Sequence, residues 1–200
     1  MKVARLVCGF CFSAAAFAAS PTHPLEVLGV PLGASAEKLH QVIPQIKCYG
    51  ATCSFDPIDA AIAQCGPMSS NPGVLDCYAQ AGSEYAFGPA RGAKYTAYLK
   101  DGRVGEFRVT FPIASADEVV SALKEQYGPP SDDREFEAQN RLGLKFHNRA
   151  VAWRRADGEI TVQRRSIDVD TGLATFAAAW YSSGTADDQE IAGKSDPTPQ

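Results

Sequence analysis

The sequence predicts an α+β domain, in which an antiparallel sheet built from β-hairpins carries short helices on one face and disulfides stabilise the whole. Alternating apolar residues flank Asp101-Gly102 and flank Asp157-Gly158 again, which is typical of hairpins. Apolar residues at helical spacing follow the first hairpin directly. With 45% hydrophobic residues in 200, the chain is long enough for one globular domain with a sizeable core.

Residues 1–18 have the pattern of a secretory signal peptide. Basic residues precede an uncharged run from Leu6 to Ala19 that ends in small residues, as cleavage sites do. The run is shorter than the roughly 20 apolar residues that span a bilayer, so we expect cleavage and no stable membrane anchor. The mature protein is then periplasmic or secreted, with a single domain over residues 19–182 and a disordered acidic tail over residues 183–200.

Cysteines remain in even number after this cleavage, which in an exported chain indicates disulfides. They are Cys48, Cys53, Cys65 and Cys77. Three pairings are possible, and we expect Cys48 to bond Cys53 and Cys65 to bond Cys77. Zinc is the alternative, but the segment lacks a paired CxxC pattern and a nearby histidine. No cofactor is expected.

Two short helices are expected before the first hairpin. One follows Ser35 and ends at Pro44, whose ring disfavours helical geometry in the preceding residue. The other begins after Asp56 as N-cap and ends at Gly66-Pro67. Its expected buried face consists of Ile58, Ala61, Ile62 and Cys65. Residues 66–92, rich in Gly, Pro, Ser and Asn, predict a long loop held by its cysteine.

The apolar residues of the first hairpin are odd-numbered on both arms. Placing them on one face requires an even pairing sum, that is, the numbers of two facing residues must add to an even total. The loop must then have an odd number of residues. This predicts the loop Lys100-Asp101-Gly102 with a G1 bulge, so that Leu99 faces Arg103 and Tyr95 faces Phe107.

The helix after this hairpin is expected to begin at Ser115, with Glu118 completing a capping box, and to end at Gly128-Pro129-Pro130. Its sheet-facing stripe is expected to be Val119, Val120, Leu123 and Tyr127. Residues 134–147 predict an irregular strand or a pair of strands.

In the second hairpin the apolar residues are odd-numbered on one arm and even-numbered on the other. The phase therefore predicts a two-residue type I′ turn at Asp157-Gly158, with Trp153 facing Val162 on the core side. Arg154 and Arg165 then share the other face. A last strand is expected over Leu173 to Tyr181.

Ala34–Leu39 and Ala114–Val119 correspond at an offset of 80 residues, and each opens a helix that precedes hairpin sequence, which suggests two α-β-β units. The first, read from Gly33 to Leu39, also resembles the Gly-x-[Ser/Thr]-x-x-x-[Val/Leu] helix start of the SmpA/OmlA (BamE) and β-lactamase-inhibitor-protein-like families. The resemblance implies a small exported α+β domain that binds another protein. It covers about ten residues in each half of the chain, and the lipid-attachment cysteine at the mature N-terminus of SmpA/OmlA proteins is lacking here.

Removal of residues 1–18 takes away two of the 19 Lys and Arg residues, which leaves 17 against 23 Asp and Glu, and a formal net charge of about −6 argues against nucleic-acid binding. The sequence contains no Gly-x-Ser-x-Gly elbow, phosphate-binding loop or HExxH motif, and the three histidines, His23, His40 and His147, lack metal-ligand spacing. We therefore expect no enzymatic activity.

Residues 134–165 are locally basic in this acidic chain. Arg154, Arg165 and Arg149 are the candidates for binding an acidic protein surface or an anionic envelope polymer, and a solvated sheet face is the alternative interpretation. The resulting hypothesis is a non-catalytic exported domain, inhibitor-like, that binds another envelope or extracellular protein. A periplasmic hydrolase and a small-ligand carrier are the competing hypotheses.

Overall fold

The computed structural model describes residues 23–65, 72, 85–139, 143–166 and 168–181. Its elements in chain order are β1 (Glu26–Val27), β2 (Val30–Pro31), α1 (Ala36–Val42), β3 (Lys47–Tyr49), β4 (Thr52–Phe55), α2 (Pro57–Cys65), β5 (Lys94–Lys100), β6 (Arg103–Pro112), the 3-10 turn η1 (Ile113–Ser115), α4 (Ala116–Tyr127), β7 (Asp132–Gln139), β8 (Lys145–Arg155), β9 (Gly158–Gln163) and β10 (Thr171–Ala178). The predicted signal peptide, the acidic tail and Cys77 lie outside the described residues.

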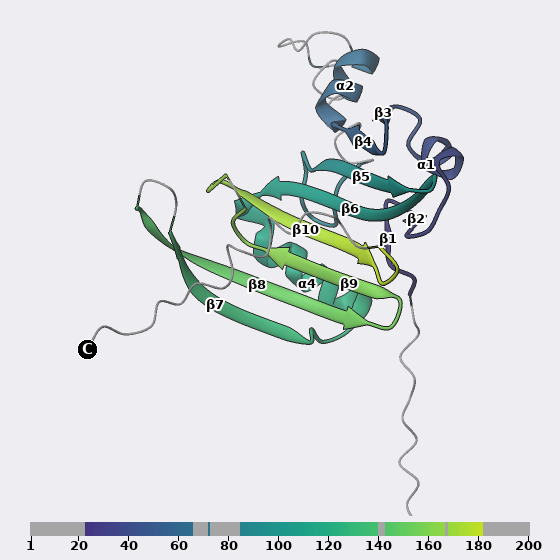
Figure 1. The fold of residues 1–200 in the computed structure, drawn as a ribbon. Helices are drawn as coiled ribbons and strands as arrows, with labels where there is room; N and C mark the ends of the chain where they lie inside the picture. Colours follow the sequence, from purple (N-terminus) through teal and green to yellow (C-terminus); the bar gives the residue numbers. More distant parts are fainter. Residues whose placement is uncertain (1–22, 66–71, 73–84, 140–142, 167, 182–200) are drawn as a thin grey trace, which may run out of the picture.

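The main body is an eight-stranded antiparallel sheet in the order β3-β4-β5-β6-β10-β9-β8-β7 (Figure 1). Each half is a meander of consecutive strands, β3 to β6 and β7 to β10, and the two meanders join where β6 pairs with β10. A helix precedes each half, α1 before β3 and α4 before β7. The α+β class and the antiparallel sheet are confirmed.

The register aligns apolar side chains across the strands into a core on one face. One such row runs Cys53, Ala97, Phe107, Phe176, Ile160 and Trp153, and all six are buried. Helix α4 packs on this face through Val119, Val120 and Leu123. In Figure 1 the helix lies behind the sheet, and no described helix covers the opposite face.

The first hairpin has the expected phase but a different turn. Lys100 pairs with Arg103, so the loop is Asp101-Gly102, and both residues have positive φ, as a type I′ turn requires. The even pairing sum is restored instead by a register shift beside Tyr98, which leaves Gly105 as the extra residue of β6. The predicted three-residue loop and its pairs are therefore wrong.

The observed pairs in this hairpin are Tyr95 with Val109 and Leu99 with Val104. The odd-numbered residues still share the buried face, because a bulge and a longer loop change the pairing sum by the same amount. The apolar pattern therefore predicts which residues of the hairpin face the core. It does not determine which residues form the turn or which residues pair.

The second hairpin likewise keeps its phase and shifts its register. Arg155 pairs with Gly158, so the loop is Ala156-Asp157, and Trp153 faces Ile160 instead of Val162. Neither loop residue has positive φ, so the predicted type I′ turn is wrong. Gly158 enters the strand, where a Cβ would collide with the Ala177 carbonyl.

The helix ends differ in their caps. The Ser35 hydroxyl accepts a hydrogen bond from Lys38 N at 3.3 Å, whereas Ser115 ends the η1 turn and makes no side-chain cap bond. The predicted capping box at Ser115 is therefore absent. In α2, Asp56 Oδ1 accepts from Ile58 N at 2.9 Å as expected for an N-cap.

The expected buried face of α2 is only partly correct. Ala61 is buried, but Ile58 and Ile62 are about half exposed, at 48% and 47%. Apolar spacing identifies one side of a helix, but it does not say how much of that side meets a neighbour.

The Cys48–Cys53 disulfide is formed, as predicted, between residues directly opposite each other in β3 and β4. Cys65 is also disulfide-bonded. Its predicted partner, Cys77, lies outside the described residues.

Trp153 is the core residue whose loss should be costliest. It is 2% exposed, and its Nε1 donates to the Gly128 carbonyl at 2.8 Å, which ties β8 to the end of α4. Trp153→Ala should lower the free energy of unfolding by about 3–5 kcal/mol through lost burial and a cavity. Trp153→Phe, which keeps a ring, should cost about 1–2 kcal/mol. Urea unfolding measures both, and equal losses would contradict the assigned packing.

Candidate interaction surface

The face of the sheet opposite α4, here called the open face, has small side chains over β8, β9 and β10. One row across all the strands runs Lys47, Ser54, Thr96, Arg108, Thr175, Thr161, Ala152 and Asp132. A second runs Lys94, Thr110, Leu173, Gln163, Ala150 and Arg134. On β10, β9 and β8 these rows contribute only Ala, Thr, Leu and Gln, so this part of the open face carries small and uncharged side chains, and charged groups lie on the strands to either side.

Larger side chains gather over β5 and β6 on the open face. The Arg108 guanidinium lies 5.0 Å from the Tyr98 ring centroid, and that of Arg103 lies 5.7 Å from the Trp180 ring centroid. Trp180 meets Tyr181 edge to face, at 6.1 Å between centroids. These five residues, Tyr98, Arg103, Arg108, Trp180 and Tyr181, are called the aromatic–arginine cluster below.

The bulge residue Gly105 makes room for this cluster. A Cβ at Gly105 would collide with the Tyr181 ring, so only glycine lets the ring lie against the strand. Burial raises the pKa of Tyr181, and the negative charge of Glu106 raises it further. The Tyr181 hydroxyl therefore remains a neutral hydrogen-bonding group at neutral pH.

Glu106 is a buried carboxylate on the open face. It is 3% exposed, and it accepts a hydrogen bond from Arg108 Nε at 2.6 Å. A buried charge needs such a partner, and the pair holds the guanidinium where it also covers Tyr98. Glu106 thus orients one arginine of the cluster.

The structure brings two of the three predicted arginines to the open face. Arg154 lies on the row of Glu159 and makes an ion pair with it at 3.2 Å. Arg165 lies over the Phe146 ring at 5.7 Å, and its Nη1 donates to the Val169 carbonyl at 2.7 Å. Both arginines therefore have partners within the chain, and whether they also bind an acidic protein stays a prediction.

Arg149 does not share that surface. It lies on the α4 side of the sheet, where its Nε is 2.8 Å from Asp133 Oδ1 and its Nη1 is 3.1 Å from Asp117 Oδ1. Lys124 of α4 also reaches Asp133, at 3.2 Å. Arg149 thus joins β8 to β7 and to α4.

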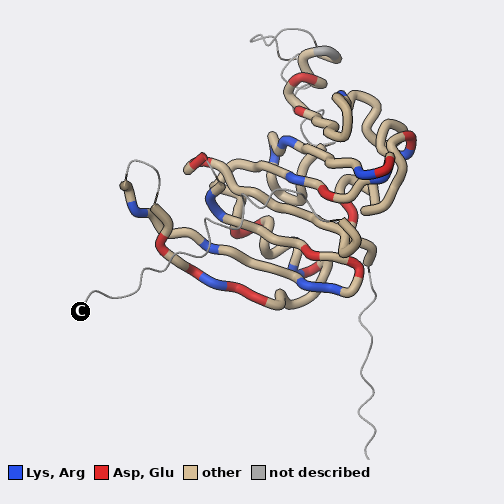
Figure 2. Tube along the Cα trace, viewed as in Figure 1, with Lys and Arg blue, Asp and Glu red and all other residues tan. Residues whose placement is uncertain are grey.

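Other basic residues of the 134–165 segment also pair with carboxylates. The pairs are Arg134 with Asp132, Lys145 with Glu137, Arg155 with Asp157 and Arg164 with Asp117. Figure 2 shows basic and acidic positions side by side along β7 and β8. The local excess of positive charge in the sequence is therefore divided between the two faces and partly neutralised.

The open face nevertheless carries more basic than acidic side chains. Among the described residues, its basic side chains include Lys47, Lys94, Arg103, Arg108, Arg134, Arg154 and Arg165, and its acidic ones include Glu106, Asp132 and Glu159, together with Asp56, whose Oδ2 lies 2.9 Å from Lys94 Nζ. The whole chain has a formal net charge of −4. Charge is thus distributed unequally over the molecule, with the positive excess on the face that α4 leaves open.

A hollow of about 250 Å³ lies on the α4 side of the sheet. It is lined by Val27, Leu28, Phe87, Val119, Leu123 and Phe176 among others. Sites for small molecules usually measure about 300–1,000 Å³, so this hollow is small for the carrier hypothesis.

In the described part of the chain, no group of three or more His, Cys, Asp and Glu side chains is placed to hold a metal ion. None of the described helices combines the length and the apolar character needed to cross a bilayer. No family model, curated protein or solved structure matches this chain. The resemblance to the SmpA/OmlA and β-lactamase-inhibitor-protein-like families therefore stays a prediction.

The Asp133 ion pairs generate a prediction about acid stability. Hydrogen bonds from Arg149, opposed by partial desolvation and assisted by Lys124, lower the pKa of Asp133 from 3.8 to about 2. A carboxyl whose folded-state pKa is depressed stabilises the protein above its unfolded pKa, and this contribution is lost as pH falls from about 4 towards 2.

Asp133→Asn should therefore lower the free energy of unfolding at pH 7 by about 1 kcal/mol, allowing for solvent screening, and should flatten its decline between pH 4 and pH 2. Urea unfolding across this pH range measures the effect. Asp132→Asn is the matched control, because the Asp132 carboxylate lies on the open face and is 3.8 Å from Arg134. An acid decline of the same slope in Asp133→Asn and wild type would contradict the assignment.

Proposed function

We propose that this chain is an exported, non-catalytic domain that binds another envelope or extracellular protein through its open face. The aromatic–arginine cluster is the anchor of the interface, and the partner presents an acidic surface. The protein acts in the periplasm or outside the cell after residues 1–18 are removed, and its role is inhibitor-like, in that binding alone is its activity.

The cluster is the observation that carries the proposal. Trp, Tyr and Arg are the residues that most often dominate the energy of protein interfaces, and here they meet on a face that no described helix covers. Trp180 keeps 47% of its surface exposed although its ring is already positioned by Arg103 and Tyr181. A large side chain held in place before binding loses little conformational entropy on association.

The chemistry of the open face supports an acidic protein as partner. Its excess of basic groups attracts negative charge, while the small side chains over β8, β9 and β10 suit a broad, flat contact better than a small molecule. Enzymatic hydrolysis receives less support, because the buried carboxylate of this face, Glu106, is already engaged by Arg108.

The topology supports a further part of the proposal, that the chain consists of two related units. Helix α1 precedes the β3–β4 hairpin and α4 precedes the β7–β8 hairpin, and each unit contributes one edge of the sheet. The two helix-opening segments correspond at an offset of 80 residues. In this arrangement the units join at β6 and β10, so the open face spans both.

Trp180→Ala tests the anchor. The variant should fold with a free energy of unfolding within about 1 kcal/mol of wild type, since the ring is half exposed, but should bind the partner at least tenfold more weakly. Tagged mature wild type and variant are compared by pull-down from envelope extract, followed by titration with the recovered protein.

Ile62→Ala is the matched control, because Ile62 has the same exposed fraction, 47%, but belongs to α2, which Figure 1 shows beyond β4 at the top of the picture. The control should bind like wild type. Equal binding by wild type and Trp180→Ala, or a loss in Ile62→Ala alone, would sink the proposal.

The charged part of the interface is tested separately by replacing Arg154 and Arg165 with glutamate. Stability should change by no more than about 1 kcal/mol per site, because Arg154 is exposed and Arg165 partly so. The double variant should lose the acidic partner, and wild-type binding should weaken as salt rises, because exposed charges are screened. If the folded double variant still binds, and if binding does not depend on salt, these arginines belong to a solvated surface and do not contact the partner.

A further inference from the structure

The two cysteines of the Cys48–Cys53 disulfide differ in their exposure to solvent. Cys53 is fully buried in the core row, with 0% of its surface exposed, whereas Cys48 is only partly buried. Cys48 belongs to β3, an edge strand of the sheet that pairs with β4 alone. An external thiol therefore reaches Cys48 before it reaches Cys53.

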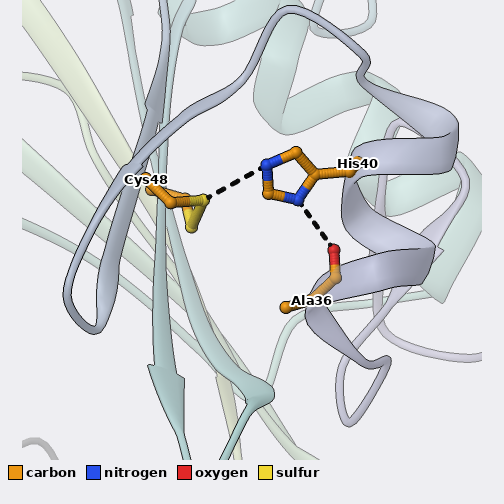
Figure 3. The surroundings of a disulfide bond; sticks show 4 residues. Ala36, His40 and Cys48 are labelled. Carbon is orange, nitrogen blue, oxygen red and sulfur yellow. Dashed lines mark hydrogen bonds between the residues drawn. A yellow bond between two sulfur atoms is a disulfide. The ribbon is translucent and has the colours of Figure 1, made fainter.

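His40 of α1 faces the sulfur of Cys48 (Figure 3). The Nδ1 atom of His40 is 2.9 Å from the Ala36 carbonyl oxygen, and Nε2 is 3.8 Å from Cys48 Sγ. Because a carbonyl can only accept, Nδ1 carries a proton and donates it. The ring is thereby held with Nε2 directed at the sulfur.

The interaction between His40 and Cys48 differs between the disulfide and the reduced cysteine. A disulfide sulfur carries no proton, so Nε2 offers a lone pair when neutral and an N–H when protonated. After reduction, an imidazolium at this distance stabilises the Cys48 thiolate, which is the reactive form of cysteine. Cys53, buried among apolar side chains, has no such neighbour among the contacts of the described residues and favours the neutral thiol.

We propose that Cys48–Cys53 is a thiol–disulfide exchange site for low-molecular-weight thiols of the glutathione class, with Cys48 as the exchanging sulfur and His40 as its proton partner. This activity is independent of partner binding, since the pair lies on the α4 side of the sheet and not on the open face. An exchange site needs one exposed, activated sulfur and one sheltered sulfur to resolve the intermediate, and the hairpin provides both.

Exchange with a thiol RSH takes two steps. A thiolate RS⁻ attacks Cys48 Sγ, the Cys48–Cys53 bond breaks, and Cys53 leaves as a thiolate that takes up a proton. A second RS⁻ attacks the sulfur of the bound R group, forming RSSR and releasing Cys48 as a thiolate paired with protonated His40. Two RSH are oxidised to RSSR, and the protein disulfide is reduced to two thiols.

Glu37 lies on the same helix as His40, and the two side chains interact electrostatically. After reduction, a thiolate at Cys48 and a protonated His40 attract each other across the contact shown in Figure 3.

The test compares wild type with His40→Gln, and His147→Gln on β8 is the matched control. The reduced proteins are alkylated with iodoacetamide between pH 5 and pH 10, and peptide mass spectrometry reports each cysteine. In wild type and in the control, the midpoint for Cys48 should lie at least about one pH unit below the usual value near 8.5, and Cys53 should react at least tenfold more slowly. His40→Gln should raise the Cys48 midpoint by about one unit.

Reoxidation by glutathione disulfide at pH 6.5 should be about three- to fourfold slower in His40→Gln. The thiolate fraction falls tenfold for each unit of pKa, and the higher nucleophilicity of the more basic thiolate compensates in part. A merely structural role for His40 would not shift the pH profile.

A second measurement starts from the oxidised, folded protein, so it does not depend on the fold of the reduced form. Wild type is treated with glutathione, quenched with acid and mapped, and the mixed disulfide should be found on Cys48. A midpoint near 8.5 in both wild type and His40→Gln, or glutathione attached to Cys53 instead, would overturn the proposal.

Discussion

The alternation of side chains along paired strands is the constraint on which the rest of this structure depends. Once Phe107 is opposite Phe176, and Phe176 opposite Ile160, every residue with the same phase is directed at the core. The intervening residues must then face the other way, whatever their chemistry. Helix α4 covers the apolar face because its own stripe needs burial, and the opposite face is left to arginines, threonines and alanines.

This constraint also explains how much could be predicted from the sequence. Parity alone assigns Tyr95, Phe107 and Trp153 to the buried face, and the structure agrees for each. Register requires the turn as well, and here the predicted pairs were wrong: by one residue next to the first turn, by two residues beyond its bulge, and by two residues in the second hairpin. One extra residue in the loop and one extra residue in a bulge both change the pairing sum from odd to even. The apolar pattern therefore could not distinguish them.

Gly105 was the available signal in the first hairpin. An isolated glycine within a strand pattern indicates a bulge or a close approach of another group, and at this position it permits both. The approaching group is Tyr181, more than seventy residues later in the chain. The cluster could not be assembled from sequence, because Trp180 and Tyr181 follow the last strand and their neighbours depend on how β10 pairs with β6.

Charge was the least predictable property of the candidate site. The sequence shows the basic residues of segment 134–165 as one group, but strand alternation separates Arg149 and Arg154 onto opposite faces. The partners of Arg149 come from α4 and β7, at positions that no local pattern connects. A surface excess of charge therefore has to be counted on a face, after pairing, and not along a segment.

The central claim is that the partner binds the open face. Hydroxyl-radical footprinting of the complex with the recovered partner tests this directly, because the oxidation of each side chain reports its exposure. The account predicts that oxidation of Trp180 falls at least severalfold on binding, while that of Ile62 on α2 does not change. Unchanged oxidation of Trp180, together with protection of Ile62, would contradict it.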